Sequence, residues 1–397
     1  MTRWRALFLL AAAELAGMSL WFGASAAAPA LAQRWGLAAA DAGHLTLAVQ
    51  LGFVVGTLVS AVSNLSDVYP PRYVFAVSAL LAALANAVFA LASAGVVLGL
   101  ALRFATGFCL AGVYPPGMKM MASWFREGRG LALGILIGAL TLGKASPYLV
   151  NAIGSADWRV NLVALSIFAI AGGAVALAVG DGPFATGTAP FDVHQVFNVF
   201  RNRGVRLASF GYFGHMWELY AMWTWIPVMI RASLDATGEP HRLAEVASFV
   251  VIGAGAAGCV AAGFAADRWG RTAVASAAMA VSGACCIAVG FFFGSSATAL
   301  LTIAAIWGAT VVADSAQFSA CVTELADPRY LGTALTLQIC LGFLLTTASI
   351  ALVGRLQQAV GWQWAFASLA PGPALGVVAM MRLRSLPEAV RIAQGRR

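Results

Sequence analysis

Charged residues are scarce in this chain. They make up 10% of its 397 residues, whereas 61% are hydrophobic, and a soluble globular chain carries about 25% charged residues. This shortage excludes a soluble domain with a solvated surface and indicates an integral membrane protein in contact with the lipid bilayer. At roughly 20 apolar residues for each membrane-spanning helix, the length suits about twelve helices.

The chain also lacks the sequence patterns of several chemistries. Its six cysteines fall inside or at the ends of apolar segments without CxxC spacing, so we expect buried free thiols, no disulfide framework and no metal site. A nucleotide-binding loop of the form GxxxxGK(S/T) is missing, which disfavours an ATP-driven pump. No nucleophile–base set stands out either, so we predict neither an enzyme with catalytic residues nor a cofactor.

What the chain does contain is a series of apolar segments separated by short polar loops. We therefore predict an all-α membrane protein with twelve transmembrane helices in two six-helix halves, residues 1–180 and 207–397, joined by a polar connector, 181–206. The connector suits either an amphipathic helix on the membrane surface or a solvated linker. The predicted spans are 5–28, 44–64, 72–93, 95–119, 129–152, 158–180, 206–230, 244–266, 272–294, 298–322, 331–353 and 363–383.

Basic residues divide unequally between the two ends of these spans. If the first helix runs outward, the outer side receives only Arg34, Arg159, Arg231, Arg242 and Arg355, and the other basic residues outside the spans lie on the inner side. This positive-inside bias places both termini in the cytoplasm. It also explains the net charge of +8 without a nucleic-acid partner. Abundant Ala and Arg with little Lys suggest a bacterial inner (plasma) membrane.

The first segment has a second interpretation. Arg3 and Arg5, the apolar run that follows and an Ala-Pro-Ala-Leu-Ala stretch resemble a cleaved signal peptide. Glu14 in the middle of the apolar run argues against cleavage, and so does the odd number of spans that cleavage would leave. We therefore interpret this segment as the first transmembrane helix.

The two halves repeat each other at a fixed offset. Asp67 after the second span corresponds to Asp267 after the eighth, since 267 − 67 = 200, and Arg129 corresponds to Arg329 at the same offset. Matching positions in register indicate two copies of one six-helix unit.

The most distinctive polar stretch of the chain runs from Gly263 to Arg271. It reads GxxxDRxGR, with Gly263, Asp267, Arg268, Gly270 and Arg271 at the fixed positions. This stretch resembles the signature loop of the major facilitator superfamily of secondary transporters. The charges suit a cytoplasmic loop, where Asp267 can meet the positive end of the helix that follows.

The first-half copy of this loop is degraded. It keeps Asp67 and has Arg72 further on, but lacks the first glycine and the arginine after the aspartate. The resemblance implies a gating role for both copies. It also extends to Arg103 and Gly107 in the fourth span, which match the family's RxxxG element; in the family this arginine is often linked to proton coupling. Alternatively, Arg103 extends to the outer membrane surface.

Charges inside the first and fifth spans are candidates for substrate and proton binding. Glu14 lies in the first span, and Lys144 lies in the fifth on one helix face with Tyr148 and Asn151. An intramembrane charge costs at least about 2.5–3.5 kcal/mol and should face a wet cavity or a partner. Lys144 therefore either binds an anionic substrate or pairs with Glu14 or another buried acid, Glu218.

Further candidates lie in the seventh and tenth spans. His215 and Glu218 are spaced i, i+3, as are Asp314 and Gln317. Carboxyl groups and imidazoles in such places can exchange protons, because burial disfavours the charged carboxylate. Aromatic residues of the seventh span, Trp225 among them, suit either a substrate wall or an interfacial belt.

These features predict a secondary active transporter that moves a small solute by alternating access of its two halves, as symport or antiport, and as a monomer. Protons are the expected partner, and Arg103 with Lys144 favours an organic anion as substrate. The alternative is a proton-driven multidrug or metabolite efflux pump, which the aromatic seventh span and the buried acids favour. The chain lacks the paired arginines expected of nitrate transporters or organophosphate antiporters. A non-transporting sensor would not need the buried charges.

Overall fold

The computed structural model describes residues 1–36, 42–92, 95–125, 128–154, 157–185, 199–327 and 331–396. Within these ranges the chain is helical and contains no strand. Half of the connector predicted at 181–206, residues 186–198, and Arg329 lie outside the described residues. The same holds for the side chains of Asp67 and Arg129, although the helices that carry them are described.

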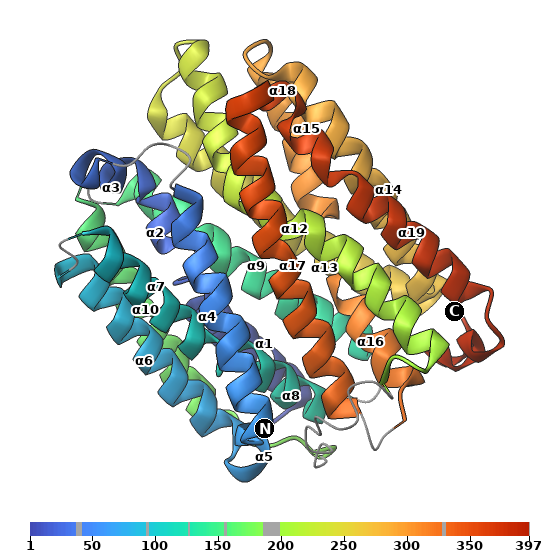
Figure 1. The fold of residues 1–397 in the computed structure, drawn as a ribbon. Helices are drawn as coiled ribbons and strands as arrows, with labels where there is room; N and C mark the ends of the chain where they lie inside the picture. The colour runs from blue at the N-terminus through green and yellow to red at the C-terminus, as the bar shows by residue number, and fades with distance from the viewer. Residues whose placement is uncertain are drawn as a thin grey trace.

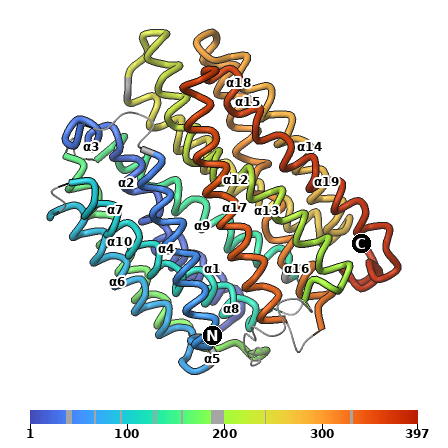
Figure 2. Tube along the Cα trace, viewed as in Figure 1, coloured from blue at the N-terminus to red at the C-terminus, as the bar shows by residue number. Residues whose placement is uncertain are grey.

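The helices form two groups that lie side by side (Figures 1 and 2). The first contains α1 Arg3–Met18, α2 Gly23–Ala26, α3 Ala28–Trp35, α4 Ala42–Val62, α5 Leu65–Val68, α6 Pro71–Ala92, α7 Val96–Leu110, α8 Tyr114–Trp124, α9 Arg129–Ile153 and α10 Trp158–Leu177. The second contains α12 Arg203–Ala236, α13 His241–Trp269, α14 Arg271–Ala288, η3 Val289–Phe292, α15 Ala297–Thr310, α16 Ser315–Leu325, α17 Leu331–Val360, α18 Trp362–Ala365, η5 Phe366–Leu369, α19 Pro371–Arg384 and η6 Pro387–Gly395. Both termini lie at the same end of the bundle, which we call the terminal end (Figure 1).

Ten stretches of helix in the described part of the chain are long and apolar enough to cross a membrane. They coincide with the predicted spans except the first and the seventh. The first predicted span is broken into α1 and α2, and α12 is 34 residues long but does not meet the apolar criterion. These two helices begin the two halves, and both carry buried acids, Glu14 and Glu218.

Breaks interrupt several of the predicted spans, the twelfth among them, which is divided into α18, η5 and α19. Alongside the break after Met18 in α1, the fourth span divides after Leu110, just before the Pro115-Pro116 pair, and the tenth divides after Thr310. Proline lacks a backbone donor and clashes with the preceding turn, which explains the break in the fourth span. The last two breaks lie 310 − 110 = 200 residues apart, the same offset as the sequence motifs.

The two halves meet along α9 and α13 near the terminal end. Three glycines of α9 lie against the backbone of α13: an added Cβ would come within 2.6 Å of the Cys259 oxygen at Gly134 and 3.0 Å of the Ala256 oxygen at Gly138. The third, Gly130, faces Gly263 across the contact, where the Cβ of a residue replacing Gly263 would lie 2.7 Å from the Gly130 oxygen. We call this contact the glycine seam. Small residues let helix backbones approach closely, so the seam closes the terminal end.

A second contact between the halves lies toward the opposite end, where α4 packs against α17. Trp225 of α12 fills the space between them, because a Cβ at Gly43 or Gly354 would meet its ring at 2.8 or 2.6 Å. Its indole N–H donates to the Ile350 carbonyl at 2.8 Å. The halves are therefore in contact near both ends of the bundle.

The glycine seam generates a prediction about closure. A Gly134→Leu change inserts a side chain where the Cys259 carbonyl lies, and overpacking of this kind costs about 1–3 kcal/mol, enough to lower the closed population about tenfold. With Cys259 as the sole cysteine, we expect maleimide to label Cys259 about tenfold faster in the variant.

The matched control is Gly253→Ala on α13, where a Cβ meets nothing closer than 3.4 Å. This variant should label as slowly as the parent. Equal labelling rates in the Gly134→Leu and Gly253→Ala proteins would contradict a closing role for the seam.

Candidate functional site

The centre of the bundle holds a buried ammonium group among aromatic rings. Lys144 lies midway along α9 and is 1% exposed. Its Nζ is 4.1 Å from the ring centroid of Trp21, 4.5 Å from that of Tyr220 and 5.2 Å from that of Trp223, and it donates a hydrogen bond to the Tyr220 hydroxyl. Over the described ranges, no carboxylate lies within ion-pair distance of this ammonium.

Both halves contribute to this arrangement, which we call the aromatic cage. Phe53 of α4 and Phe343 of α17 close it, with ring centroids 4.5 Å apart. Trp21 is 5.1 Å from Phe53, and Tyr220 is 5.0 Å from Phe343. The members are Trp21, Phe53 and Lys144 from the first half and Tyr220, Trp223 and Phe343 from the second. The ring faces carry partial negative charge, so they stabilise the ammonium by about 2 kcal/mol when it is desolvated.

Two indole N–H groups in the cage have no hydrogen-bond partner in the described part of the molecule, those of Trp21 and Trp223. The amide of Gln50, one helical turn before Phe53 on α4, is fully buried and also lacks partners there. Buried polar groups are normally paired, and unpaired ones are costly. The Trp21 and Trp223 N–H groups and the Gln50 amide are therefore buried polar groups without a partner among the described residues.

Arg103 holds the break between α1 and α2 in place. It is fully buried, so it does not extend to the membrane surface, and its guanidinium donates to the carbonyls of Leu20 at 3.1 Å and Trp21 at 2.5 Å. A third hydrogen bond, 3.1 Å long, goes to the side-chain oxygen of Asn86. The side-chain Nδ2 of Asn86 in turn donates to the Leu162 carbonyl. These bonds satisfy carbonyls that the interrupted helix leaves without partners and thereby position Trp21.

Glu14 lies on α1 in a different environment from Lys144. It is fully buried, and neither carboxyl oxygen has a hydrogen-bond partner among the residues described. A Cβ at Gly117 of α8 would lie 2.4 Å from one of these oxygens, so the missing side chain at Gly117 makes room for the carboxyl group. Lys144 is close enough to act on Glu14 electrostatically, although the two do not form an ion pair.

The second half contains two buried acids in separate settings. Glu218 accepts hydrogen bonds from Trp307 at 2.5 Å, Ser282 at 2.9 Å and Cys286 at 3.0 Å. The His215 Nδ1 lies 2.8 Å from the Asp314 Oδ1, within ion-pair distance. His215 and Glu218 are therefore both buried on α12, but they contact different residues.

A polar cluster at the terminal end links several helices of the second half. Arg271 at the start of α14 donates to Glu324 of α16 at 2.8 Å and to Gln317 at 3.2 Å. Glu324 also accepts the backbone N–H of Ala393 in η6 at 3.0 Å. Gln317 thus belongs to this cluster and not with Asp314, although the two are spaced i, i+3.

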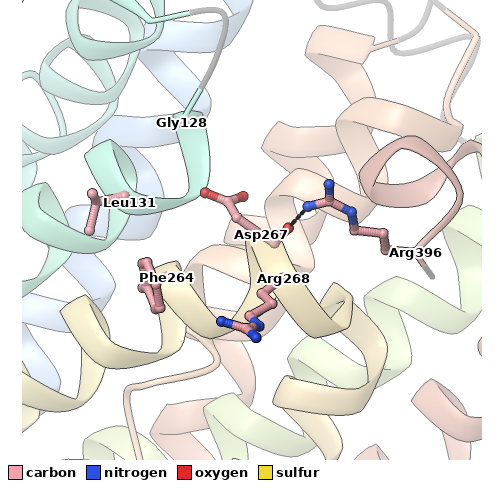
Figure 3. Close-up of a pocket in the computed structure, with 6 residues that line it drawn as sticks. All are labelled: Gly128, Leu131, Phe264, Asp267, Arg268 and Arg396. Carbon is pink, nitrogen blue, oxygen red and sulfur yellow. Dashed lines mark hydrogen bonds between the residues drawn. The ribbon is translucent and has the colours of Figure 1, made fainter.

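Asp267 connects the two halves at the same end. Its carboxylate lies over the start of α9, where a Cβ at Gly130 would be 2.4 Å from one oxygen. The sequence analysis expected this carboxylate to meet the N-terminus of the helix that follows Asp267, α14, and the structure places it at α9 instead. A carboxylate near a helix N-terminus is stabilised by the helix dipole. Figure 3 shows this carboxylate directed toward Gly128, with Arg396 donating to the Asp267 backbone oxygen and Arg268 directed away. A surface pocket of about 480 Å³ lies here.

The remaining predicted residues lie away from the cage. Trp225 seals the opposite end, and Tyr148 is buried one turn beyond Lys144, near the ion pair of Arg231 with Glu245. Arg72 stacks on the ring of Tyr73 at the start of α6, which follows the short helix α5.

Sequence reasoning did not select most of the cage. Phe53 and Phe343 are two of 23 phenylalanines, and nothing in their local sequence distinguishes them. Tyr220 and Trp223 lie in the aromatic seventh span, where Trp225 was chosen instead. Their spacing from Glu218 was the available signal, but spacing on one helix does not say which residue faces Lys144 on another.

Comparison with known proteins agrees with this architecture. The profile of the Major Facilitator Superfamily matches residues 7–346, most of the chain. The chain belongs to the major facilitator superfamily. A search of curated proteins found no match. The profile match confirms the family resemblance of the sequence. Superfamily members are multi-pass membrane transporters of small solutes and not, in general, enzymes. This superfamily protein is a membrane transporter.

The position of Arg103 generates a prediction about the stability of this superfamily transporter. Arg103→Leu leaves the Leu20, Trp21 and Asn86 oxygens without their donor. Each buried hydrogen bond left unmade costs about 1–3 kcal/mol, so we expect the free energy of unfolding to fall by about 3 kcal/mol or more. Unfolding of the detergent-purified protein measures the loss.

Arg103→Lys should lose less, because it keeps the charge but not the planar fork of donors. Arg159→Leu is the control: Arg159 is partly exposed and 3.7 Å from Asp157, and such surface pairs contribute about 0–1 kcal/mol. If Arg103→Leu and Arg159→Leu are equally stable, Arg103 does not hold the break.

Proposed function

We propose that the chain is a secondary active transporter of a small organic anion, driven by protons and working by alternating access of two six-helix halves. The observation that carries the proposal is the buried ammonium of Lys144, which forms no ion pair with a carboxylate in the described ranges. A cation in the bilayer interior costs at least about 2.5–3.5 kcal/mol. The partial compensation by aromatic rings leaves it ready to accept an anion.

The location of the cage supports alternating access. Lys144 belongs to one half and its hydrogen-bond partner Tyr220 to the other, so a solute bound here touches both moving bodies. The halves meet near both ends, at the glycine seam and around Trp225, as expected of an intermediate closed to both sides. In this proposal twelve helices cross a bacterial inner membrane, both termini are cytoplasmic, and the protein works as a monomer.

Gating follows from the contacts at the terminal end, which the proposal places in the cytoplasm. Asp267 reaches across to α9 of the other half, while Arg271 and Gln317 stay within the second half. Opening this end separates the Asp267 carboxylate from the α9 N-terminus. We therefore assign Asp267 and Gly263 to a cytoplasmic latch, and the gating role that the sequence suggests for Arg268, Arg271, Asp67 and Arg72 stays a prediction.

Four buried groups support proton coupling: Glu14, Glu218, and the facing pair His215 and Asp314. All are at most 1% exposed, and a carboxyl or imidazole in that setting can change its charge when its surroundings open to water. Movement of protons down their gradient through such groups supplies energy without a nucleotide.

An efflux pump for lipophilic drugs is the second candidate. The unpartnered carboxyl of Glu14 and the aromatic cage favour it, because aromatic rings and a buried acid attract organic cations. Lys144 argues against it, since its ammonium occupies the cage and repels a second cation. The two candidates differ in the sign of charge that the cage accepts.

Replacement of Lys144 tests that sign. Loss of one partner from a buried charge pair costs about 2–5 kcal/mol, so Lys144→Gln should weaken carboxylate binding more than about tenfold. Neutral amides of the same compounds should bind the two proteins alike, and Lys144→Arg should keep part of the carboxylate affinity. A thermal-shift screen of purified protein against paired acids and amides measures this; equal losses for both would make Lys144 purely structural.

Proton coupling is tested in reconstituted vesicles. Uptake of a carboxylate found in that screen should accelerate when an inward-directed proton gradient is imposed, and one of Glu14→Gln, Glu218→Gln or Asp314→Asn should abolish the acceleration. An uptake rate that is unchanged by the proton gradient and by all three substitutions would rule out proton coupling.

A further inference from the structure

The pocket at the terminal end lies where the two halves meet. Gly128 and Leu131, at the start of α9, line it from the first half. Phe264 of α13 and Arg396, at the end of the C-terminal segment, line it from the second. Its volume of about 480 Å³ lies within the range of about 300–1,000 Å³ that ligand sites occupy. A ligand in this pocket therefore contacts both halves.

Positive charge predominates among the described side chains that line the pocket. Arg268 has no hydrogen bond or ion pair with the described residues, and Arg396 donates one N–H, to the backbone oxygen of Asp267. Asp267 is the only acid among the described lining residues, and its carboxylate lies in the seam against Gly130, where the N-terminus of α9 stabilises it. The two guanidinium groups keep most of their donors free, and such groups bind phosphate.

An apolar face adjoins these charges on the outside of the bundle. Val260, Phe264 and Arg268 are spaced i, i+4, i+8 on α13, so they lie on one helix face, and all three are exposed. Leu131 and Phe264 lie on one side of the pocket and Arg396 on the other (Figure 3). The exposed apolar surface of a membrane transporter faces lipid chains. A column of apolar side chains that ends in an arginine therefore matches the two parts of a phospholipid.

Trp269 indicates the depth of the pocket in the membrane. It follows Arg268, ends α13 and is 64% exposed. Tryptophan is enriched at the level of the lipid headgroups, so Arg268 lies at that level too. Basic pockets between transmembrane helices bind anionic headgroups there. A zwitterionic headgroup fits less well, because its own cation already compensates its phosphate.

The C-terminal segment, residues 387–396, is held in a shape that brings Arg396 to the pocket. Ala389 and Ile392 are fully buried, and the segment packs on α16, where the Ala393 N–H donates to Glu324 at 3.0 Å. Ala393 and Gln394 have φ angles of 47° and 57°. Non-glycine residues adopt this left-handed conformation at a cost, and it persists where surrounding contacts impose it. Arg396 is therefore a fixed part of the pocket wall.

We propose that this pocket binds the headgroup of an anionic phospholipid, with Arg268 and Arg396 as its phosphate ligands, and that the bound lipid favours closure of the terminal end. The lipid contacts α9 of one half and α13 with the C-terminal segment of the other, and these surfaces separate when the glycine seam opens. A ligand favours the state that it binds more tightly, and opening removes one side of this site. The inference does not depend on the transported solute or on the driving ion.

Lipid binding is measured by native mass spectrometry of the full-length protein in detergent, titrated with phosphatidylglycerol. Arg268→Gln and Arg396→Gln should each weaken binding about fivefold, the usual contribution of one arginine near an anionic headgroup. Arg382→Gln is the matched control, because Arg382 is an exposed arginine in the last turn of α19 that does not line the pocket. It should bind the lipid as the wild type does. Equal weakening by all three substitutions would overturn the site, because it would show attraction to overall charge alone.

Two further ligands test the chemistry of the occupant. Phosphatidylcholine has chains and a phosphate but no net charge, and it should bind about fivefold more weakly or less. Equal binding of the two lipids would overturn the preference for an anionic headgroup. Glycerol 1-phosphate has the phosphate without the chains and should not displace phosphatidylglycerol. Displacement at equal concentration would make the pocket a site for soluble phosphate esters and would overturn the lipid assignment.

The effect on closure is measured in the same detergent with Cys259 as the sole cysteine. With free phosphatidylglycerol at ten times its dissociation constant, maleimide should label Cys259 about tenfold more slowly than without lipid. A variant with both Arg268→Gln and Arg396→Gln should be labelled at nearly the same rate with and without that lipid concentration. Lipid that binds without slowing the labelling, or that slows it equally in the double variant, would overturn the link to closure.

Discussion

Compensation of one positive charge inside an apolar bundle is the constraint on which the centre of this protein depends. Lys144 cannot reach water from its place on α9, and the described structure gives it ring faces and one hydroxyl oxygen in place of a carboxylate. Those rings come from helices of both halves. The charge therefore lies where helices of the two halves meet.

The same helix carries both the site and the closure. α9 has Gly130, Gly134 and Gly138 in its first turns, where the seam and the Asp267 carboxylate lie, and Gly143 and Lys144 at its middle, against α1 and the cage. A change in the contacts of Lys144 acts on the same helix whose first turns contact α13 of the opposite half. α9 therefore links the aromatic cage directly to the contact between the halves at the terminal end.

The sequence predicts the class of this protein well and its centre only in part. Composition and the GxxxDRxGR loop were sufficient for the family and for the helical segments, because hydropathy and turn chemistry are local properties. The burial of Glu14, Lys144, His215, Glu218 and Asp314 followed from their places within apolar runs. Their partners did not follow: Gln317 joins Arg271, Arg103 caps the α1 break, and Phe53 meets Phe343 across the halves. Such pairings depend on helix rotation and depth, which spacing along one helix leaves open.

Two helices that are not among the ten apolar spans have a consequence for biosynthesis: α1, which ends after 16 residues, and α12, which does not meet the apolar criterion. α1 and α12 begin their halves, and each carries an acid that lipid alone cannot stabilise. Either helix emerging from the ribosome by itself is a poor substrate for release into the bilayer. Each must be retained at the insertion machinery until later helices surround it, α9 and α10 for α1 and α17 and α19 for α12. Assembly of each half is thereby a cooperative event, in which the buried acids of α1 and α12 depend on later helices for a stable environment.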